Sequence, residues 1–133
     1  MKNELRMVRY DADCRLEAYW FKGILQAFPN HFHDYYVIGY IESGRRSLVH
    51  NGREYALEPG DLLIFNPKES HACAPADGTA LDYRSLNIPC ETMLDAVEEI
   101  TGGTEAPLFD SPALFHSDLV GPLAELHGMI MRQ

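Results

Sequence analysis

The chain has 133 residues, a formal net charge of −9 and an apolar content of 46%. This length suits one domain with one core, and twenty acids against eleven bases disfavour a chain that itself binds nucleic-acid phosphates. No apolar run approaches the roughly 20 residues of a membrane span, and the charged N-terminus is not a secretory signal, so we expect a cytoplasmic protein.

Short strands separated by turn signals are predicted up to residue 88. Residues 1–13 are polar without clear periodicity and are interpreted as an N-terminal arm, and Pro29-Asn30 is expected to break the chain. Asn51-Gly52 predicts a type I′ hairpin turn, and the segment 58–61 (Glu-Pro-Gly-Asp) predicts a type II turn. Alternation and β-branched or aromatic content predict strands over 15–21, 35–41, 46–50, 53–57, 62–65, 71–74 and 81–88.

Two helices are predicted after Pro89. In the first, Leu94, Val97 and Ile100 lie on one face, and Gly102-Gly103 is a plausible stop. In the second, four apolar residues recur at steps of four, three and four: Leu119, Leu123, Leu126 and Ile130. This stripe is suited to packing on the strands or to forming a seam with a second copy, and the two roles are not exclusive.

Three histidines are the strongest candidates for chemistry. His31 and His33 are two residues apart and project from the same face of a strand, and His71 opens a later strand where it can converge with them. Three imidazoles can hold a divalent transition metal such as zinc, nickel, iron or copper. The alternative is a polar pocket floor in which the imidazoles bond to one another, to water or to a ligand.

The remaining histidines and the cysteines carry no comparable pattern. His50, His116 and His127 lack partners at metal-ligand spacing and are predicted to lie on the surface. Three widely spaced cysteines form no CxxC pair and are interpreted as reduced thiols rather than as a redox sensor: Cys14, Cys73 and Cys90.

The spacing of these residues resembles the cupin motifs. The first motif runs His-x-His, three or four residues, Glu, six residues, Gly, and here His31-Phe32-His33 is followed at that spacing by Val37 and Gly44. The second runs Gly, five residues, Pro-x-Gly, two residues, His, three residues, Asn, and Gly60 and His71 keep the spacing. Three motif positions differ: Val37 stands for the metal-binding Glu, Lys68 for Gly and Pro75 for Asn.

A closer resemblance, over roughly residues 30–90, is to the N-terminal sensor domain of AraC-type transcription regulators. Their pattern, H-x-H-D-x-Y-x-I-x-x-I-x-x-G followed by x-G-x-x-Y-x-L-x-P-G-D-L-x-L-x-x-P-x-x-x-H, is similar to residues 31–44 and 51–71 here. The resemblance implies a barrel that binds an effector, helices that make a dimer contact, and a separate C-terminal domain with two helix-turn-helix motifs. The chain stops where that DNA-reading domain would begin.

We therefore predict a mainly β cupin domain (double-stranded β-helix, a jelly-roll barrel) followed by two C-terminal helices. Residues 1–13 form the arm, 14–90 the effector-binding barrel and 91–133 the helical dimerisation segment. The arm is a candidate cover for the pocket, because similar domains use theirs in this way. The expected activity is to bind a small molecule, such as a sugar or another small polar metabolite, and thereby to shift how DNA-binding domains are presented.

Aromatic residues on the predicted strands are candidate effector contacts beside the three histidines. Trp20, Tyr36 and Tyr83 combine an apolar ring with a polar tip, which suits a sugar-like or aromatic ligand, although each also suits plain core packing. Arg84 is either a partner for an anionic effector or a solvent-facing residue.

The main alternative is a small standalone metal-dependent cupin enzyme, such as a dioxygenase or isomerase. That function needs a metal on the three histidines, an open coordination site and a general base. Glu69 lies in a predicted turn and is a poor base, and Val37 in the ligand position weighs against the enzyme. A storage or scaffold barrel is a third interpretation, which leaves the helical stripe unexplained.

Overall fold

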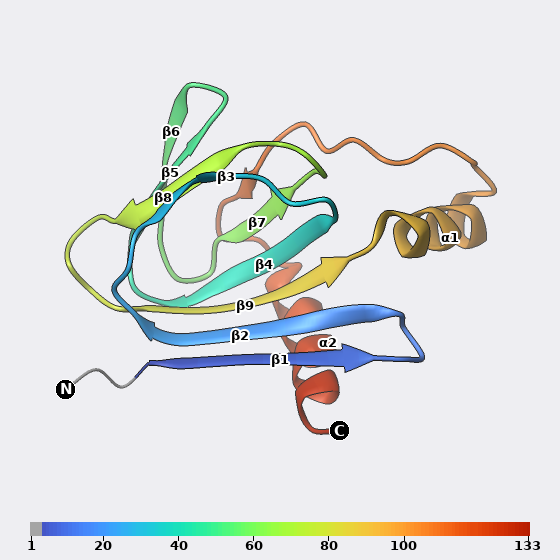
Figure 1. Ribbon diagram of the computed structural model, residues 1–133, viewed down its shortest axis with the longest axis horizontal. Coiled ribbons are helices and arrows are strands. Elements are labelled where there is room, and N and C mark those ends of the chain that lie inside the picture. Colours follow the sequence, from blue (N-terminus) through green and yellow to red (C-terminus); the bar gives the residue numbers. More distant parts are fainter. Residues whose placement is uncertain (1–3) are drawn as a thin grey trace.

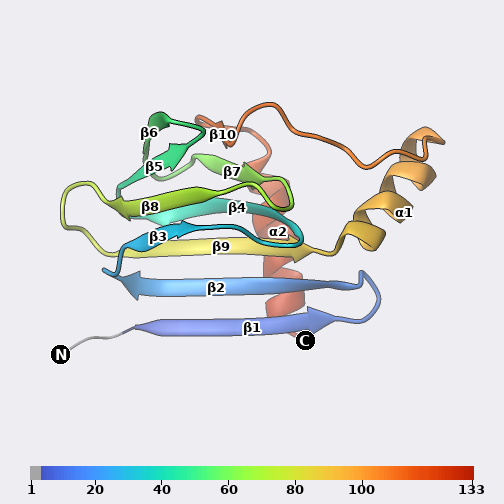
Figure 2. The ribbon, with the colours of Figure 1, turned by 45° about the horizontal axis from the view of Figure 1, so that its top comes forward.

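The computed structural model describes residues 4–133 as two antiparallel β-sheets that face each other, followed by two helices (Figures 1 and 2). One sheet has six strands in the order β1-β2-β9-β4-β7-β10, and the other has four in the order β3-β8-β5-β6. The strands are β1 (Leu5–Asp11), β2 (Leu16–Ile24), β3 (Phe28–His31), β4 (Tyr36–Ser43), β5 (Arg46–His50), β6 (Arg53–Leu57), β7 (Leu62–Phe65), β8 (His71–Pro75), β9 (Leu81–Ile88) and β10 (Ala113–Leu114). The seven strands predicted from the sequence are all present, with ends that shift by a few residues.

Strand alternation separates two cores. Residues on the facing sides of the sheets form the inner core, to which Ile41, Leu48 and Leu63 belong. The opposite side of the six-stranded sheet carries a second cluster, which includes Ala18 and Leu86. Because neighbouring residues of a strand point to opposite faces, each of β2, β4 and β9 contributes to both cores.

The N-terminal segment differs from the predicted arm. Leu5–Asp11 forms β1 and pairs with β2 along its whole length, so this part of the predicted arm is a strand of the six-stranded sheet. Residues 1–3 lie outside the described part of the chain. Since β1 is an edge strand whose side chains are mostly exposed, it needs no alternation of apolar and polar residues, which explains why its sequence shows none.

The predicted break at Pro29-Asn30 is also wrong, because Phe28–His31 forms the short strand β3. β3 lies at the edge of the four-stranded sheet, where a proline without an N–H group is tolerated. Only two of its residues are in register with β8: Phe28 opposite Cys73 and His31 opposite His71. This irregular pairing is sufficient to place His31 next to His71.

Both predicted turns are confirmed. Asn51 and Gly52 have φ angles of 49° and 74° in the β5–β6 hairpin, as a type I′ turn requires. In the next turn Gly60 has φ 95°, and the Asp61 N–H donates to the carbonyl oxygen of Glu58 at 3.1 Å. The buried Asp61 carboxylate accepts hydrogen bonds from the backbone N–H groups of Glu58 and His116, each at 2.9 Å, and so ties this turn to the segment before the last helix.

The two predicted helices are present as α1 (Cys90–Thr101) and α2 (Val120–Met131). Gly102 ends α1 in the left-handed conformation, with φ 75°. Across residues 4–133, no helix has the length and apolarity that a membrane span needs.

Helix α2 crosses the outer side of the six-stranded sheet over β1, β2 and β9 (Figures 1 and 2). Three members of the apolar stripe pack there: Leu123, Leu126 and Ile130. Leu119 is 56% exposed. The stripe therefore packs mainly on the chain's own sheet, with Leu123 and Leu126 partly buried, Ile130 buried and Leu119 exposed.

His127 lies on the same face of α2 and is fully buried, so the prediction of a surface residue is wrong. Its position between Leu123 and Ile130, at helical spacings of four and three, was the signal for burial. The Nε2–H group donates to the carbonyl oxygen of Tyr19 at 2.7 Å, and Nδ1 has no hydrogen-bond partner in the described chain. His116, by contrast, is exposed as predicted.

Burial lowers the pKa of His127, and the positive charge of Arg84 acts in the same direction, whereas the bond to the Tyr19 carbonyl and the charge of Glu42 oppose it. A histidine whose pKa is lower in the folded than in the unfolded state stabilises the fold above the unfolded value of about 6.5, and that contribution is lost as the pH falls below it. Protonation here places a charge on Nδ1, where no acceptor lies.

We therefore predict that part of the acid sensitivity of the fold comes from His127. The wild-type protein loses stability between pH 7.5 and 5.5, and His127→Gln loses measurably less over the same interval. Urea unfolding at both pH values measures this, with Glu125→Gln on the exposed side of α2 as the control. Equal losses in the wild type and His127→Gln would contradict the prediction.

Candidate functional site

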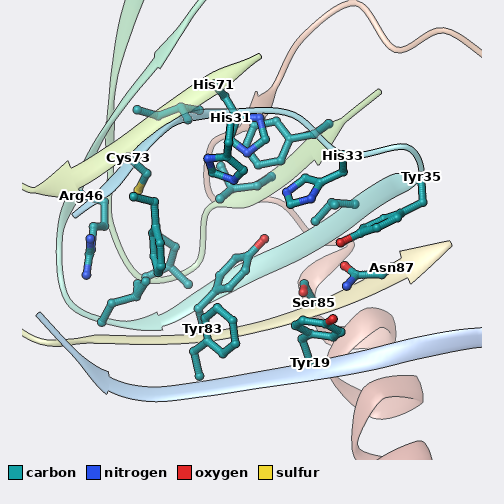
Figure 3. A pocket seen from close by; sticks show the side chains of 18 residues that line it. Tyr19, His31, His33, Tyr35, Arg46, His71, Cys73, Tyr83, Ser85 and Asn87 are labelled. Carbon is teal, nitrogen blue, oxygen red and sulfur yellow. The ribbon is translucent and has the colours of Figure 1, made fainter. Parts of the chain in front are cut away.

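A cavity of about 130 Å³ lies between the two sheets. Its walls come from the inward-facing residues of both sheets and from the β3–β4 connection (Figure 3). The apolar part is formed mainly by Phe21, Phe28, Val37, Ile41, Leu48, Leu63, Phe65 and Leu81. The polar part contains the three predicted histidines together with Tyr19, Tyr35, Arg46, Cys73, Tyr83, Ser85 and Asn87. A mostly apolar cavity with a few converging polar groups is the usual form of a small-molecule site.

His31, His33 and His71 meet at this cavity, as the sequence predicts (Figure 3). Their ring centroids are 4.4 Å apart for His31 and His71, 4.9 Å for His31 and His33, and 5.4 Å for His33 and His71. One ring nitrogen from each lies within 4.8 Å of the others. His71 is further held by Phe65, whose ring stacks on the imidazole at 3.7 Å with an interplanar angle of 5°.

The backbone fixes the tautomers of two of these rings. Nδ1 of His31 lies 2.6 Å from the carbonyl oxygen of Pro29, and Nδ1 of His71 lies 3.3 Å from that of Glu69. A carbonyl oxygen only accepts, so both Nδ1 atoms carry the proton and both Nε2 atoms are left with a free lone pair. A backbone partner on one ring nitrogen is the usual support for a histidine that binds a ligand or metal through the other.

The surroundings keep two of the three imidazoles neutral. Burial lowers the pKa of His71 to about 4, with His31, His33 and His50 adding to the effect and the Glu69 carbonyl opposing it. Burial and His31 also lower the pKa of His33, against a smaller opposing effect of Asp34. At neutral pH these rings are therefore available as acceptors or metal ligands.

His50 and Glu69 lie behind His71, and the prediction that His50 is a surface residue is wrong. His50 is opposite His71 in the β5–β8 pairing and is 6% exposed, and its Nε2 lies 2.8 Å from Oε1 of Glu69. Alternation along β5 was the signal, because His50 is two residues from the inward-facing Leu48. His50 does not line the cavity, but it supports the segment that carries His71.

Two of the predicted ligand contacts lie on the outer side of the six-stranded sheet, away from the cavity. Tyr36 faces the second core, where its hydroxyl donates to the Pro107 carbonyl at 2.6 Å. Trp20 also faces outward, with the guanidinium carbon of Arg84 4.3 Å from its ring centroid, and Arg84 is paired with Glu42 at 2.8 Å. Arg84 is thus also excluded from the cavity. Of the three predicted aromatic contacts, only Tyr83 lines it.

Residues next to Trp20 and Tyr36 in the sequence line the cavity in their place. Tyr19 and Tyr35 line the cavity, as do Ser85 and Asn87, which continue the alternation from Tyr83 along β9. The signal was present in the sequence, because Tyr35 and Val37 follow His31 and His33 in steps of two, whereas Tyr36 is out of phase. None of the described residues before β2 lines the cavity, so β1 is not a cover for it.

Gly39 allows Tyr83 to lie across the six-stranded sheet. A Cβ atom at this position would overlap the Tyr83 hydroxyl group and would lie 2.8 Å from the backbone oxygen of Arg84. Burial raises the pKa of Tyr83, so its hydroxyl remains protonated and can donate to a ligand.

Two solved structures described as cupins have a similar fold. A cupin superfamily protein from Desulfitobacterium hafniense DCB-2 has a TM-score of 0.57 at 16% identity, over 67% of this chain and 81% of that chain. An RmlC-like cupin with a double-stranded β-helix fold from Methanocaldococcus jannaschii also has a TM-score of 0.57, at 12% identity, over 67% of this chain and 83% of that one. At such identities the likeness concerns the fold alone, and it confirms the predicted cupin architecture.

Sequence comparison is more specific. An uncharacterized helix-turn-helix-type transcriptional regulator of Bacillus subtilis (strain 168), YbfI, is 50% identical over all 133 residues, and the chain spans 48% of that protein's length. The family model of the AraC-like ligand binding domain matches residues 16–133, which include the cavity, both helices and every strand but β1. The chain therefore belongs to the family of AraC-like ligand-binding domains.

Proposed function

We propose that this chain is the effector-sensing part of a helix-turn-helix transcription regulator and that it binds a small molecule between its two sheets. The observation that carries the proposal is the cavity itself, where polar groups from β2, β3, β8 and β9 converge inside an apolar enclosure. Buried polar groups need partners, and a bound effector supplies them.

The cavity favours a small effector. An engineered protein cavity of about 150 Å³ binds benzene, so a cavity of about 130 Å³ suits a compound of roughly that size. Polar atoms of the compound would face His31, His33 and His71 at one side, with Tyr83 and Ser85 as further hydrogen-bonding groups.

One strand links the cavity to helix α2. The Tyr19 side chain lines the cavity, whereas its backbone carbonyl accepts the hydrogen bond from His127 on the opposite face of the sheet. An effector that binds one position of β2 better than another would therefore also favour one position of α2. In this proposal α2 passes the change to the DNA-binding part of the regulator, or to a second copy of the chain.

Contact with a second copy stays a prediction. Leu119 is the exposed member of the stripe, so a seam would have to cover it. Sedimentation of Leu119→Glu, compared with Ile100→Glu on the exposed side of α1, tests whether self-association depends on this helix.

A metal ion on the three histidines is proposed as a second occupant of the cavity. Both defined Nε2 lone pairs are free, and neutral imidazoles are good ligands for zinc, nickel or iron. One nitrogen atom from each histidine lies within 4.8 Å of the others, so His31, His33 and His71 are the residues that would hold the ion. Bound there, the metal would supply a Lewis acid that binds an oxygen or nitrogen atom of the effector.

The enzyme alternative has less support than effector sensing. Val37, at the position of the cupin carboxylate ligand, is an apolar wall residue, and within residues 4–133 no Asp or Glu lines the cavity. Glu69, the candidate base of the sequence analysis, pairs with His50 and does not line the cavity. The described residues thus place no carboxylate beside the histidines that could act as a general base.

Effector binding predicts a distinct result in a thermal-shift screen of small metabolites and aromatic fragments. Compounds that occupy the cavity raise the Tm of the wild type but not that of Ser85→Leu, which fills the cavity from β9. Ser47→Leu, on the outer face of the hairpin strand β5, is the matched control and keeps the response. A screen in which every stabilising compound also stabilises Ser85→Leu would contradict binding in the cavity.

Metal binding is tested by titration of the metal-stripped protein with Zn²⁺. We expect one equivalent to bind, and His71→Ala to weaken binding at least about tenfold because one of three ligands is lost. His116→Ala, at an exposed position, is the control. Equal affinity of the wild type and His71→Ala would contradict a site on the three histidines.

A further inference from the structure

Arg46 is a fully buried cation at the wall of the cavity. It begins β5, its relative exposure is 0%, and it faces inward with Leu48. In Figure 3 Arg46 and Cys73 lie toward one end of the cavity, away from His33 and Tyr35. Arginine side chains are almost never buried to this extent without an anionic partner.

The contacts of the guanidinium group are all with neutral groups. Nη1 donates to the carbonyl oxygen of Gln26 at 2.8 Å and Nη2 to that of Ile24 at 2.7 Å. The guanidinium carbon lies 5.5 Å from the centroid of the Phe28 ring, and Nε is buried without a hydrogen-bond partner. These contacts hold the group in place but do not neutralise its charge.

No carboxylate of the described chain compensates this cation. Arg46 takes part in no ion pair in residues 4–133, and the cavity wall there contains neither Asp nor Glu, although the whole chain has twenty acidic residues. Burial lowers the pKa of Arg46, yet a guanidinium group stays protonated in proteins. The interior of an acidic domain is thus locally positive.

We propose that the effector carries a carboxylate group and that Arg46 is the residue that selects it. The inference rests on the proposed function, since it names the chemical class of the compound that binds in the same cavity. A carboxylate would accept from the unpartnered Nε–H and from a second N–H of the guanidinium fork, the planar geometry that arginine offers best. The Cys73 thiol lies beside the guanidinium and also lines the cavity, so it is the neutral group that the carboxylate would replace as the neighbour of Arg46.

A purely structural role for Arg46 would be to tie the β2–β3 connection to β5 through the carbonyls of Ile24 and Gln26. Such a role predicts lower stability when Arg46 is replaced but no preference of the cavity for anions. Discrimination between a carboxylate and its neutral amide is therefore the deciding property.

The test uses formate, the smallest carboxylate, and formamide, its uncharged counterpart, on the protein stripped of metal. Each is titrated at constant ionic strength while ¹H–¹⁵N NMR follows the Arg46 Nε–H signal and the backbone amides of Leu48 and Cys73. We expect saturable shifts with formate, at a Kd in the millimolar range because a three-atom ligand cannot bind much tighter. Formamide is expected to bind at least about tenfold more weakly, since hydrogen bonds between two charged groups are the stronger kind.

Variants separate charge from fold. Arg46→Met is expected to lose the formate response, and Arg46→Lys, which keeps the charge without the fork, is expected to retain a weaker one. Arg45→Met is the matched control, because Arg45 is the exposed neighbour that pairs with Glu58 and Asp77. If Arg46→Met does not fold, the comparison of formate with formamide in the wild type still decides.

The proposal is overturned if formate causes no saturable shift even at concentrations well above the millimolar range. It is also overturned if formamide binds as tightly as formate, or if Arg46→Met keeps the full response to formate. If neutral probes such as benzene or formamide bind in the cavity and formate is not preferred, only the proposal that the effector carries a carboxylate is contradicted. The proposed sensing function is then retained. If neither neutral nor anionic probes enter the cavity, the sensing function fails as well.

Discussion

The pairing register of β3, β8 and β5 is the constraint on which the site depends. His31 is opposite His71, and His71 is opposite His50, so one row across the four-stranded sheet brings together three imidazoles. A slip of one residue would turn all of these side chains to the other face of the sheet. The stacked Phe65 ring and the Glu69 carbonyl then fix the orientation of His71, and the Pro29 carbonyl does so for His31.

The same alternation gives the six-stranded sheet two separate tasks. Its inner face supplies Tyr83, Ser85 and Asn87 to the cavity, and its outer face supplies Leu86 and Ile88 to the core beneath α2. The sheet therefore lies between the proposed effector and the helix, and each of its faces contributes one layer of side chains. Tyr19 contacts both sides at once, because its side chain lines the cavity and its carbonyl accepts the hydrogen bond from His127 of α2.

Much of this architecture was predictable because turn chemistry and strand alternation are local. The Asn51-Gly52 hairpin, the Gly60 turn and the convergence of His31, His33 and His71 all follow from short patterns. The wrong predictions have two causes, namely the phase of the strand or helix repeat and contacts between segments distant in sequence. Tyr36 has the chemistry of a ligand contact but is out of phase with the histidines, and His127 lacks metal partners in the sequence but has the helical spacing of a buried residue. The burial of Arg46 depends on contacts between distant segments, since its hydrogen-bond acceptors are about twenty residues away, and no local pattern reports it.

A crystal structure of this domain, grown with the compound that raises its Tm most, would show directly where the effector binds. We predict electron density for that compound between the two sheets, in contact with His71 and the inward-facing residues of β9. Density on the outer face beneath α2, or a cavity closed by its own side chains with the compound bound elsewhere, would mean that the barrel interior is not the sensing site.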